Sequence, residues 1–426
     1  MRHARIAASV AALSTLALPL AACGGGGGSS SNDAFAAHLK DRGPITYVQG
    51  KVNDNATHEV IARWNAEHPD EKVTLKEQTA AADQQHDDLV RNFDAKNADY
   101  DVVSVDLVWT AEFAAKGYLQ PLKGDLAIDT NGLLDSAVKG AQYNGTQYAA
   151  PMTSDGGMLY YRSDLVKTPP KTWDELFADC AIAKQAHIDC YAGQFNKYEG
   201  LTVNASEAIN GAGGSIVGTD GKTPTVDSPE ATKGLEVLAK AYQDGDIPKQ
   251  AITYQEEEGR QSFESGKLLF LRNWPYVYSL ASGEASSKVK GKFDVAPLPG
   301  FDGVGASTLG GHNAAISAYS DHKATAIDFL KYLESEEAQS LFLGKGSLAP
   351  IRTEVYKDPA LVKKYPYLPT LLTSIENAVP RPITPFYQAV TKAVQDNAYA
   401  AIKGDKTSAQ AVKDMAAAIK AASSGQ

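Results

Sequence analysis

Aromatic and planar polar side chains gather in two turn-like segments of this sequence. Segment 272–276 reads Arg-Asn-Trp-Pro-Tyr after an apolar run, and segment 196–200 reads Asn-Lys-Tyr-Glu-Gly. Flat rings can stack on the faces of a pyranose, and planar polar groups can hydrogen-bond its hydroxyls in pairs. This combination indicates carbohydrate binding. The candidate contacts in the two segments are Trp274, Tyr276, Tyr198 and Glu199.

Four further places could supply polar contacts to a bound molecule. The pair Gly310-Gly311 precedes a β-rich run, so backbone N–H groups there could approach a ligand closely. Arg381 lies between two prolines, which hold the backbone extended and give the long side chain a defined exit. Asp106 follows a predicted parallel strand, where α/β proteins form ligand sites. Asp155 precedes a glycine pair at the boundary between two predicted units.

Four of these candidates also have a purely structural interpretation. Trp274 could be a core residue, and segment 196–200 could be a solvated turn. The glycine pair could serve only the backbone conformation, and Arg381 could be an ordinary surface side chain. The residues alone leave both interpretations open.

The sequence contains none of the common catalytic motifs. It has no Gly-x-Ser-x-Gly, no phosphate-binding Gly-x4-Gly-Lys-Ser/Thr and no His-Glu-x-x-His. The eight histidines do not pair at metal-ligand spacing. We therefore expect no cofactor, no metal and no enzymatic activity. The many carboxylates leave open a glycosidase pair, which sequence alone cannot recognise.

Net charge and chain length limit the functional class and the number of domains. The 426 residues carry 41 Lys and Arg against 51 Asp and Glu, which gives a formal charge of −10. No Lys/Arg-rich run interrupts this acidic balance, so we expect no nucleic-acid partner. The chain is long enough for two ordinary domains with a large buried core.

The N-terminus has the pattern of an export signal. Arg2 and Arg5 precede a small, apolar stretch over 7–22 that is too short for a membrane-spanning helix. It ends in Leu-Ala-Ala-Cys at Cys23, followed by five glycines. This ending resembles a bacterial lipobox, which implies cleavage before Cys23 and a diacylglycerol on its sulfur. The alternative is an ordinary signal peptide with a chance cysteine.

The remaining cysteines form an even pair once Cys23 is lipidated. Cys180 and Cys190 would then lie in an oxidising compartment, where a disulfide closing a short loop is expected. Their spacing, without paired histidines nearby, is a poor zinc site. Two free thiols are the alternative.

Apolar periodicity predicts an α/β fold. Strands at 45–48, 72–75 and 101–105 alternate with helices at 58–66 and 86–95, a pattern typical of a parallel sheet with helices on both faces. A second unit begins after Pro151, with strands at 158–161 and 268–271. Thr172 and Glu175 form a predicted capping box at the start of a helix. A βα pattern returns at 314–333, and the chain is helical from Asp358 on.

These pieces occur in the order found in a known family. The segments that carry the likeness are 100–103 with 112–119, 156–165 with 169–176, 263–267 leading to 273–275, and 326–339. The chain resembles the extracellular solute-binding proteins of ABC sugar importers, in the maltose/trehalose group. Segment 198–204 looks like the trehalose and α-glucoside binders among lipoproteins of Gram-positive bacteria, especially actinobacteria.

The resemblance implies two α/β lobes, each a mostly parallel sheet flanked by helices, joined by hinge strands and closing on ligand. It places the family's ligand contacts on Gln49, Asp106, Asp155, Tyr198, Glu199, Trp274, Tyr276, Gly310, Gly311 and Arg381. One position departs from the pattern: close relatives often carry a second tryptophan after the glycine pair, where this chain has His312. That departure puts the identity of the sugar in doubt.

We therefore predict a monomeric sugar-binding receptor, held to the membrane through Cys23, that delivers an α-linked disaccharide to an ABC permease. The predicted parts are a signal peptide (1–22), a tether (23–43), a first lobe (44–150 with 312–357) and a second lobe (154–308 with 360–426). The alternatives are an extracytoplasmic glycosidase, a polyamine or metal binder on the same fold, and a sensory lipoprotein that presents bound sugar.

Overall fold

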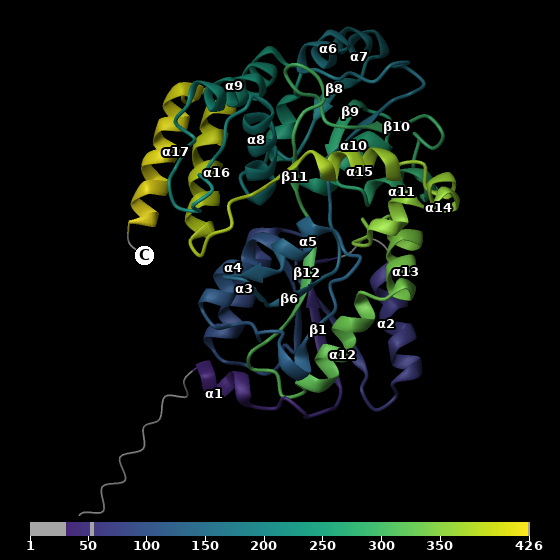
Figure 1. The fold of residues 1–426 in the computed structure, drawn as a ribbon. Coiled ribbons are helices and arrows are strands. Elements are labelled where there is room, and N and C mark those ends of the chain that lie inside the picture. The colour runs from purple at the N-terminus through teal and green to yellow at the C-terminus, as the bar shows by residue number, and fades with distance from the viewer. Residues whose placement is uncertain (1–30, 52–54, 425–426) are drawn as a thin grey trace, which may run out of the picture.

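The computed structural model describes residues 31–51 and 55–424. Its elements form two lobes, one above the other in Figure 1, each built around its own sheet. The predicted two-lobed α/β class is therefore confirmed. Cys23 and the predicted signal peptide lie outside the described residues.

The first lobe contains a five-stranded sheet in the order β2-β1-β3-β12-β6. Its strands are β1 (Ile45–Gln49), β2 (Val73–Glu77), β3 (Val102–Asp106), β6 (Ala149–Pro151) and β12 (His312–Ile316). Because β3 is apolar, β-branched and central, it is buried along its whole length. The accompanying elements are α1 (Ser31–Ala36), α2 (Ala56–Glu67), α3 (Ala82–Asp94), α4 (Thr110–Ala115), α5 (Asp135–Gly140), α12 (Lys323–Leu333), α13 (Glu336–Gly346) and a hairpin of β4 (Gln142–Tyr143) and β5 (Thr146–Gln147).

The second lobe contains a four-stranded sheet in the order β10-β7-β9-β8. Its strands are β7 (Met158–Tyr161), β8 (Asp189–Ala192), β9 (Leu268–Asn273) and β10 (Asp294–Ala296). Its helices are α6 (Trp173–Ala178), α7 (Cys180–Ala186), α8 (Glu199–Gly211), α9 (Pro229–Asp244), α10 (Glu256–Glu264), α11 (Val277–Gly283), α14 (Pro359–Lys364), α15 (Leu368–Glu376), α16 (Tyr387–Lys403) and α17 (Ser408–Ser423). Short 3₁₀ turns over the two lobes span Leu107–Trp109, Gly124–Leu126, Lys249–Thr253 and Thr353–Lys357.

Strand direction differs in part from the prediction that each sheet is mostly parallel. β1, β2 and β3 are parallel, but β12 runs antiparallel to both of its neighbours. In the second sheet β7 is antiparallel to β9 and β10, and only β8 and β9 are parallel. The reason is that β7 and β12 each begin where the chain enters the lobe from the other one. β12 therefore starts beside the end of β3, and β7 starts beside the end of β9.

The chain crosses between the lobes three times, and two of the crossing segments, 152–157 and 309–311, lie side by side; the third joins α13 to α14. Asp155 and Gly310 exchange backbone hydrogen bonds of 3.0 and 2.9 Å, and Gly156 forms a bridge with Leu309. The short strand β11 (Ser307–Leu309) leads into the second of these segments and pairs with β13 (Ala378–Pro380). Figure 1 places β11 at the junction of the lobes, as hinge strands require.

Local sequence signals account for several element boundaries. The capping box at the start of α6 is confirmed: Thr172 Oγ1 accepts from the Glu175 N–H, and the Glu175 carboxylate accepts from the Thr172 N–H, both at 3.2 Å. The structure joins Cys180, at the start of α7, to Cys190 in β8, with 5.1 Å between their Cα atoms.

Within the segment that the sequence assigned to the tether, residues 34–43 contact the first lobe. Lys323 donates to the carbonyls of Ala34 and, at 2.9 Å, of Ala37, and the Gly43 N–H donates to Thr325 at 3.1 Å. Because the Lys323 ammonium is fully buried, these carbonyls supply the hydrogen bonds that its charge needs. The tether predicted over 23–43 stays a prediction.

Candidate functional site

A cavity of about 300 Å³ lies between the lobes. Its wall includes the ends of β1 and β3 in the first lobe and the starts of α8 and α10 in the second. Every ligand contact named by the sequence lines this one cavity: Gln49, Asp106, Asp155, Tyr198, Glu199, Trp274, Tyr276, Gly310, Gly311 and Arg381. Residues as far apart in sequence as Gln49 and Arg381 therefore meet at one place, and their role in ligand contact stays a prediction.

Arg381 joins the two lobes through a buried ion pair on each side. Its Nη2 lies 2.7 Å from Asp106 Oδ1 at the end of β3, and its Nη1 lies 2.6 Å from Glu199 Oε1 at the start of α8. The Arg381 side chain is only 2% exposed. Burial raises the pKa of Glu199, while the Arg381 cation lowers it. Both terminal nitrogens of Arg381 are thus engaged by protein carboxylates, and its buried Nε is the donor without a protein partner.

Trp274 is half-buried on the cavity wall and is not a core residue. The Arg272 guanidinium carbon lies 4.0 Å from the centre of its ring. A Cβ at Gly310 would come within 2.8 Å of Trp274 Cη2 and Cζ3, so only glycine fits beside the ring edge. The indole is therefore held between a cation and bare backbone, and it contributes an apolar surface to the cavity.

The two tyrosines of the wall are fixed by carboxylates that the sequence analysis did not single out. The Tyr198 hydroxyl donates to Glu256 at 2.7 Å, and the Tyr276 hydroxyl donates to Glu257 at 2.6 Å. Because these O–H groups are already used as donors, their oxygens can still accept hydrogen bonds from a ligand. The acidic run at 256–258 looks like the solvated first turn of a helix, which is why its place in the cavity wall could not be predicted.

The glycine pair has mainly a conformational role. The Gly310 N–H donates to the carbonyl of Asp155 across the crossing segments. Gly311 has φ +118°, and a Cβ there would lie 2.3 Å from the carbonyl oxygen of Thr153. These contacts favour the conformational interpretation of the pair, and its contact with a ligand stays a prediction. His312, which follows, also lines the cavity, and burial lowers its pKa, which favours the neutral ring.

Asp155 is a carboxyl of the cavity wall whose pKa is raised. Burial raises its pKa to about 7, with Asp106 adding to the rise and Arg272 opposing it. A carboxyl of this kind is partly protonated near neutrality. It can therefore both donate to and accept from a hydroxyl group.

We expect Asp155→Asn to be more stable than the natural chain at pH 8 and equally stable at pH 4. The folded carboxyl holds its proton up to about pH 7, whereas the unfolded one releases it near pH 3.9. The Asp155 carboxyl therefore makes the unfolding free energy fall as pH rises from about 4 to about 7 in the natural chain, and this contribution is absent in the variant. Urea unfolding at five pH values measures it.

Glu334→Gln is the matched control for that experiment. Burial raises the pKa of Glu334 to about 8, so this variant should flatten the same curve over a window that extends to about pH 8. Glu334 does not line the cavity. Parallel pH curves for Asp155→Asn and the natural chain would contradict the buried, protonated state of Asp155.

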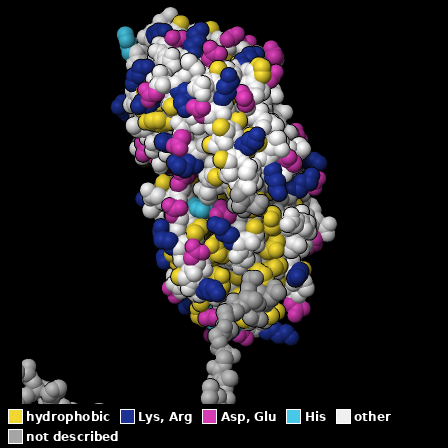
Figure 2. All heavy atoms as spheres, turned by 90° about the vertical axis from the view of Figure 1, so that its left-hand side faces the viewer, with side chains coloured by type: hydrophobic (Ala, Val, Ile, Leu, Met, Phe, Trp, Pro, Cys, Tyr) yellow, Lys and Arg dark blue, Asp and Glu magenta, His cyan; other side chains and the backbone are white. Residues whose placement is uncertain are grey.

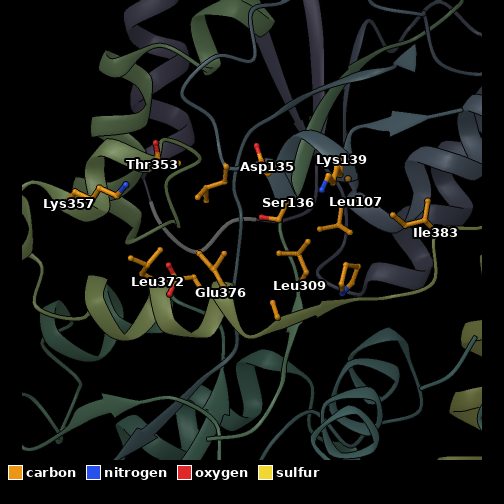
Figure 3. A pocket seen from close by; sticks show the side chains of 15 residues that line it. Leu107, Asp135, Ser136, Lys139, Leu309, Thr353, Lys357, Leu372, Glu376 and Ile383 are labelled. Carbon is orange, nitrogen blue, oxygen red and sulfur yellow. The ribbon is translucent and has the colours of Figure 1, made fainter. Parts of the chain in front are cut away.

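A second hollow of about 530 Å³ lies on the other side of β11, between α5 and α15. Figure 3 shows aliphatic side chains such as Leu107, Leu309 and Leu372 facing into it, with charged groups including Lys139 and Glu376 around them. It contains no aromatic ring. The smaller interlobe cavity is therefore the better match to a sugar.

Three other properties bear on function. Among the described residues, no group of His, Cys, Asp or Glu side chains is arranged to hold a metal ion. The described helices include none with the length and apolarity needed to cross a bilayer. Over the face that carries α16 and α17, basic and acidic side chains are interspersed (Figure 2).

This is the architecture of a cleft-type ligand-binding protein: two lobes are joined by crossing segments, and aromatic side chains line the cavity between them. The chain belongs to the bacterial extracellular solute-binding proteins, whose family model matches residues 50–340. A "Probable ABC transporter-binding protein" of Deinococcus radiodurans is 36% identical over 304 residues, 68% of this chain and 71% of that protein. The "Maltotriose-binding protein" of Pyrococcus abyssi is 26% identical over 300 residues, 67% of this chain and 62% of that protein.

The solved structure described as "Maltose bound T. maritima MalE3" has the same fold. It superposes with a TM-score of 0.84 at 33% identity and covers 88% of this chain and 99% of that one. Together these likenesses identify the chain as a solute-binding protein of the kind that serves ABC transporters for sugars.

Proposed function

We propose that this protein binds an α-linked disaccharide, similar to trehalose or maltose, between its lobes and delivers it to an ABC permease. The meeting of the half-buried Trp274 ring with carboxyl groups from both lobes in one cavity carries the proposal. A volume of about 300 Å³ is at the lower end of the pockets that hold small ligands, which supports a disaccharide over a long oligosaccharide.

A thermal-shift panel of mono-, di- and trisaccharides tests the choice of ligand. Binding to the folded state stabilises it by about 2.7 kcal/mol at a ligand concentration 100 times Kd. We expect α-linked disaccharides to raise Tm most. A panel in which no sugar raises Tm would contradict the proposal.

Small-angle scattering with and without the best sugar tests closure of the lobes. The radius of gyration should be smaller when ligand is bound, because closure is driven by ligand.

The main rival function is glycoside hydrolysis. The arrangement of Asp106 and Glu199 favours binding, because both carboxylates are paired with the same Arg381 guanidinium and neither is free to act as a general acid or base. Chromatography after long incubation with the best disaccharide should recover it intact. A sensory role on the same fold would differ only in the partner that reads the closed form.

We further propose that Cys23 is the lipidated first residue of the mature chain, so that the protein is anchored to the outer face of the cell membrane. Cys23→Ala should release the protein into the medium or leave it unprocessed. Cell fractionation with immunoblotting measures this. Retention of the variant in the membrane at the natural level would contradict the anchor. The lobe boundaries and the monomeric state predicted from the sequence are part of the same proposal.

The bond between Cys180 and Cys190 fits this location outside the cytoplasm. Reduction should cost about 2–3 kcal/mol of unfolding free energy, since the bridge closes a short loop with a sequence separation of 10. Peptide mass spectrometry under non-reducing conditions should find the linked pair. Two alkylatable thiols in the secreted protein would contradict it.

A further inference from the structure

Arg272 lies directly behind the stacking ring and does not line the cavity itself. Its side chain, which is 1% exposed, projects from β9. Nε donates to Glu207 at 2.8 Å, Nη2 also donates to Glu207, and Nη1 donates to Gln194 at 3.0 Å. These bonds fix the guanidinium, which stacks on the Trp274 ring at 4.0 Å.

Glu207 connects this cation to the strand that leads between the lobes. Its Oε1 accepts from the backbone N–H of Thr308 in the middle of β11, at 3.1 Å. Two residues further on, Gly310 meets the edge of the Trp274 ring. The Trp274 ring therefore contacts Arg272 on its face and Gly310 at its edge. Glu207 links these two contacts, because it hydrogen-bonds both Arg272 and the backbone of β11.

The other crossing segment presses on the same ion pair. A Cβ at Gly157 would lie 2.6 Å from Arg272 Nη2 and 2.8 Å from Glu207 Oε1. The Gly157 N–H donates to Ser307 at 2.7 Å, which joins it to β11. Segments 152–157 and 309–311, with the adjoining strand β11, are therefore in close contact with the Arg272–Glu207 pair, and the pair is in contact with the ring.

We propose that Arg272 is a positioning residue for sugar binding: it holds the Trp274 ring in its stacking orientation and, through Glu207, couples that orientation to the crossing segments. This inference rests on the proposed function. Closure moves the crossing segments, and the ion pair transmits that movement to the ring. A pair that served only folding would affect affinity independently of Trp274.

A double-mutant cycle separates these two roles. Arg272→Lys keeps the charge but loses the planar fork and its stacking face. Affinity for the best disaccharide, measured by calorimetry, should fall about 3- to 30-fold, the range of a partly desolvated cation–π contact. In a Trp274→Ala background the same change should cost less than about 2-fold, because the ring on which Arg272 acts is gone.

Glu112→Gln is the matched control. It breaks the buried His86–Glu112 pair of the first lobe, 3.0 Å long, which lies outside the cavity. It should lower stability, and its effect on affinity should be the same with and without Trp274. Equal affinity costs for Arg272→Lys in the two backgrounds would overturn the proposal.

A second readout does not require any ligand. The fluorescence of Trp274, obtained as the difference between each protein and its Trp274→Ala counterpart, should shift in Arg272→Lys because the ring changes its surroundings. If no sugar binds, the proposed function fails while this shift still tests the position of the ring. If Arg272→Lys does not fold, Glu207→Gln replaces it, with a smaller shift and the same non-additivity expected. An unchanged Trp274 signal in the folded variant would overturn the inference.

Discussion

Trp274→Ala should weaken binding of the disaccharide by roughly thirty- to a thousand-fold, equivalent to about 2–4 kcal/mol. The ring is half-buried on the cavity wall and already supported from behind by Arg272. Removing it takes away the apolar face on which a pyranose would stack, without emptying the core. Unfolding free energy should therefore fall by less than the about 3–5 kcal/mol usual for a core tryptophan. Calorimetry and urea unfolding measure the two effects.

Trp173→Ala is the matched control in the same lobe. Trp173 is 6% exposed, stacks on Phe177 and does not line the cavity. Its loss should reduce stability strongly while the remaining folded protein binds sugar with the natural affinity. The opposite pattern, with affinity retained and stability lost in Trp274→Ala, would mean that Trp274 is not part of the ligand site.

Arg381→Met should destabilise the protein by about 3–5 kcal/mol and abolish tight binding, because it leaves Asp106 and Glu199 buried without their shared cation. The loss should be greater at pH 8 than at pH 5. The pKa of Glu199, already raised by burial, rises further in the variant because the Arg381 cation that lowers it is gone. The stability that its proton provides is then present at low pH and is lost as pH rises through the raised pKa. Urea unfolding at the two pH values measures this.

Arg42→Met provides the control for that change. Arg42 also bridges two carboxylates, Glu71 and Asp328, but its side chain is 49% exposed. Its replacement should cost less than about 1 kcal/mol. Arg381→Lys should be intermediate, since a lysine restores the charge without the two-sided fork. If Arg381→Met and Arg42→Met lose the same stability, the buried link between the lobes does not hold them together.

Elements with strong local patterns could be predicted from the sequence. The apolar run of β3 and the Thr172–Glu175 cap determine their own structure through hydrophobicity and hydrogen bonding within a few residues. Strand direction could not be predicted from the sequence, because it depends on where the chain crosses between the lobes. The buried runs Met158–Tyr161 in β7 and His312–Ile316 in β12 carry no signal that distinguishes one direction from the other.

The candidate site likewise has one part that local sequence could predict and another part that it could not. Segments with unusual composition, such as 272–276 and 196–200, could be recognised individually, and family likeness supplied the rest of the predicted set. The pairing of Arg381 with two carboxylates, and the hydrogen bond from Gly310 to Asp155, depend on distant contacts that no local pattern encodes. The glutamates that fix Tyr198 and Tyr276 were missed for that reason.

Isothermal titration calorimetry of the purified protein with trehalose and with maltose, followed by chromatography of the recovered sugar, tests the proposed function most directly. We expect saturable binding of at least one of them, with one molecule per chain, complete recovery of the disaccharide and a large loss of affinity in Trp274→Ala. No binding of any α-linked disaccharide, or its conversion to monosaccharides, would contradict it.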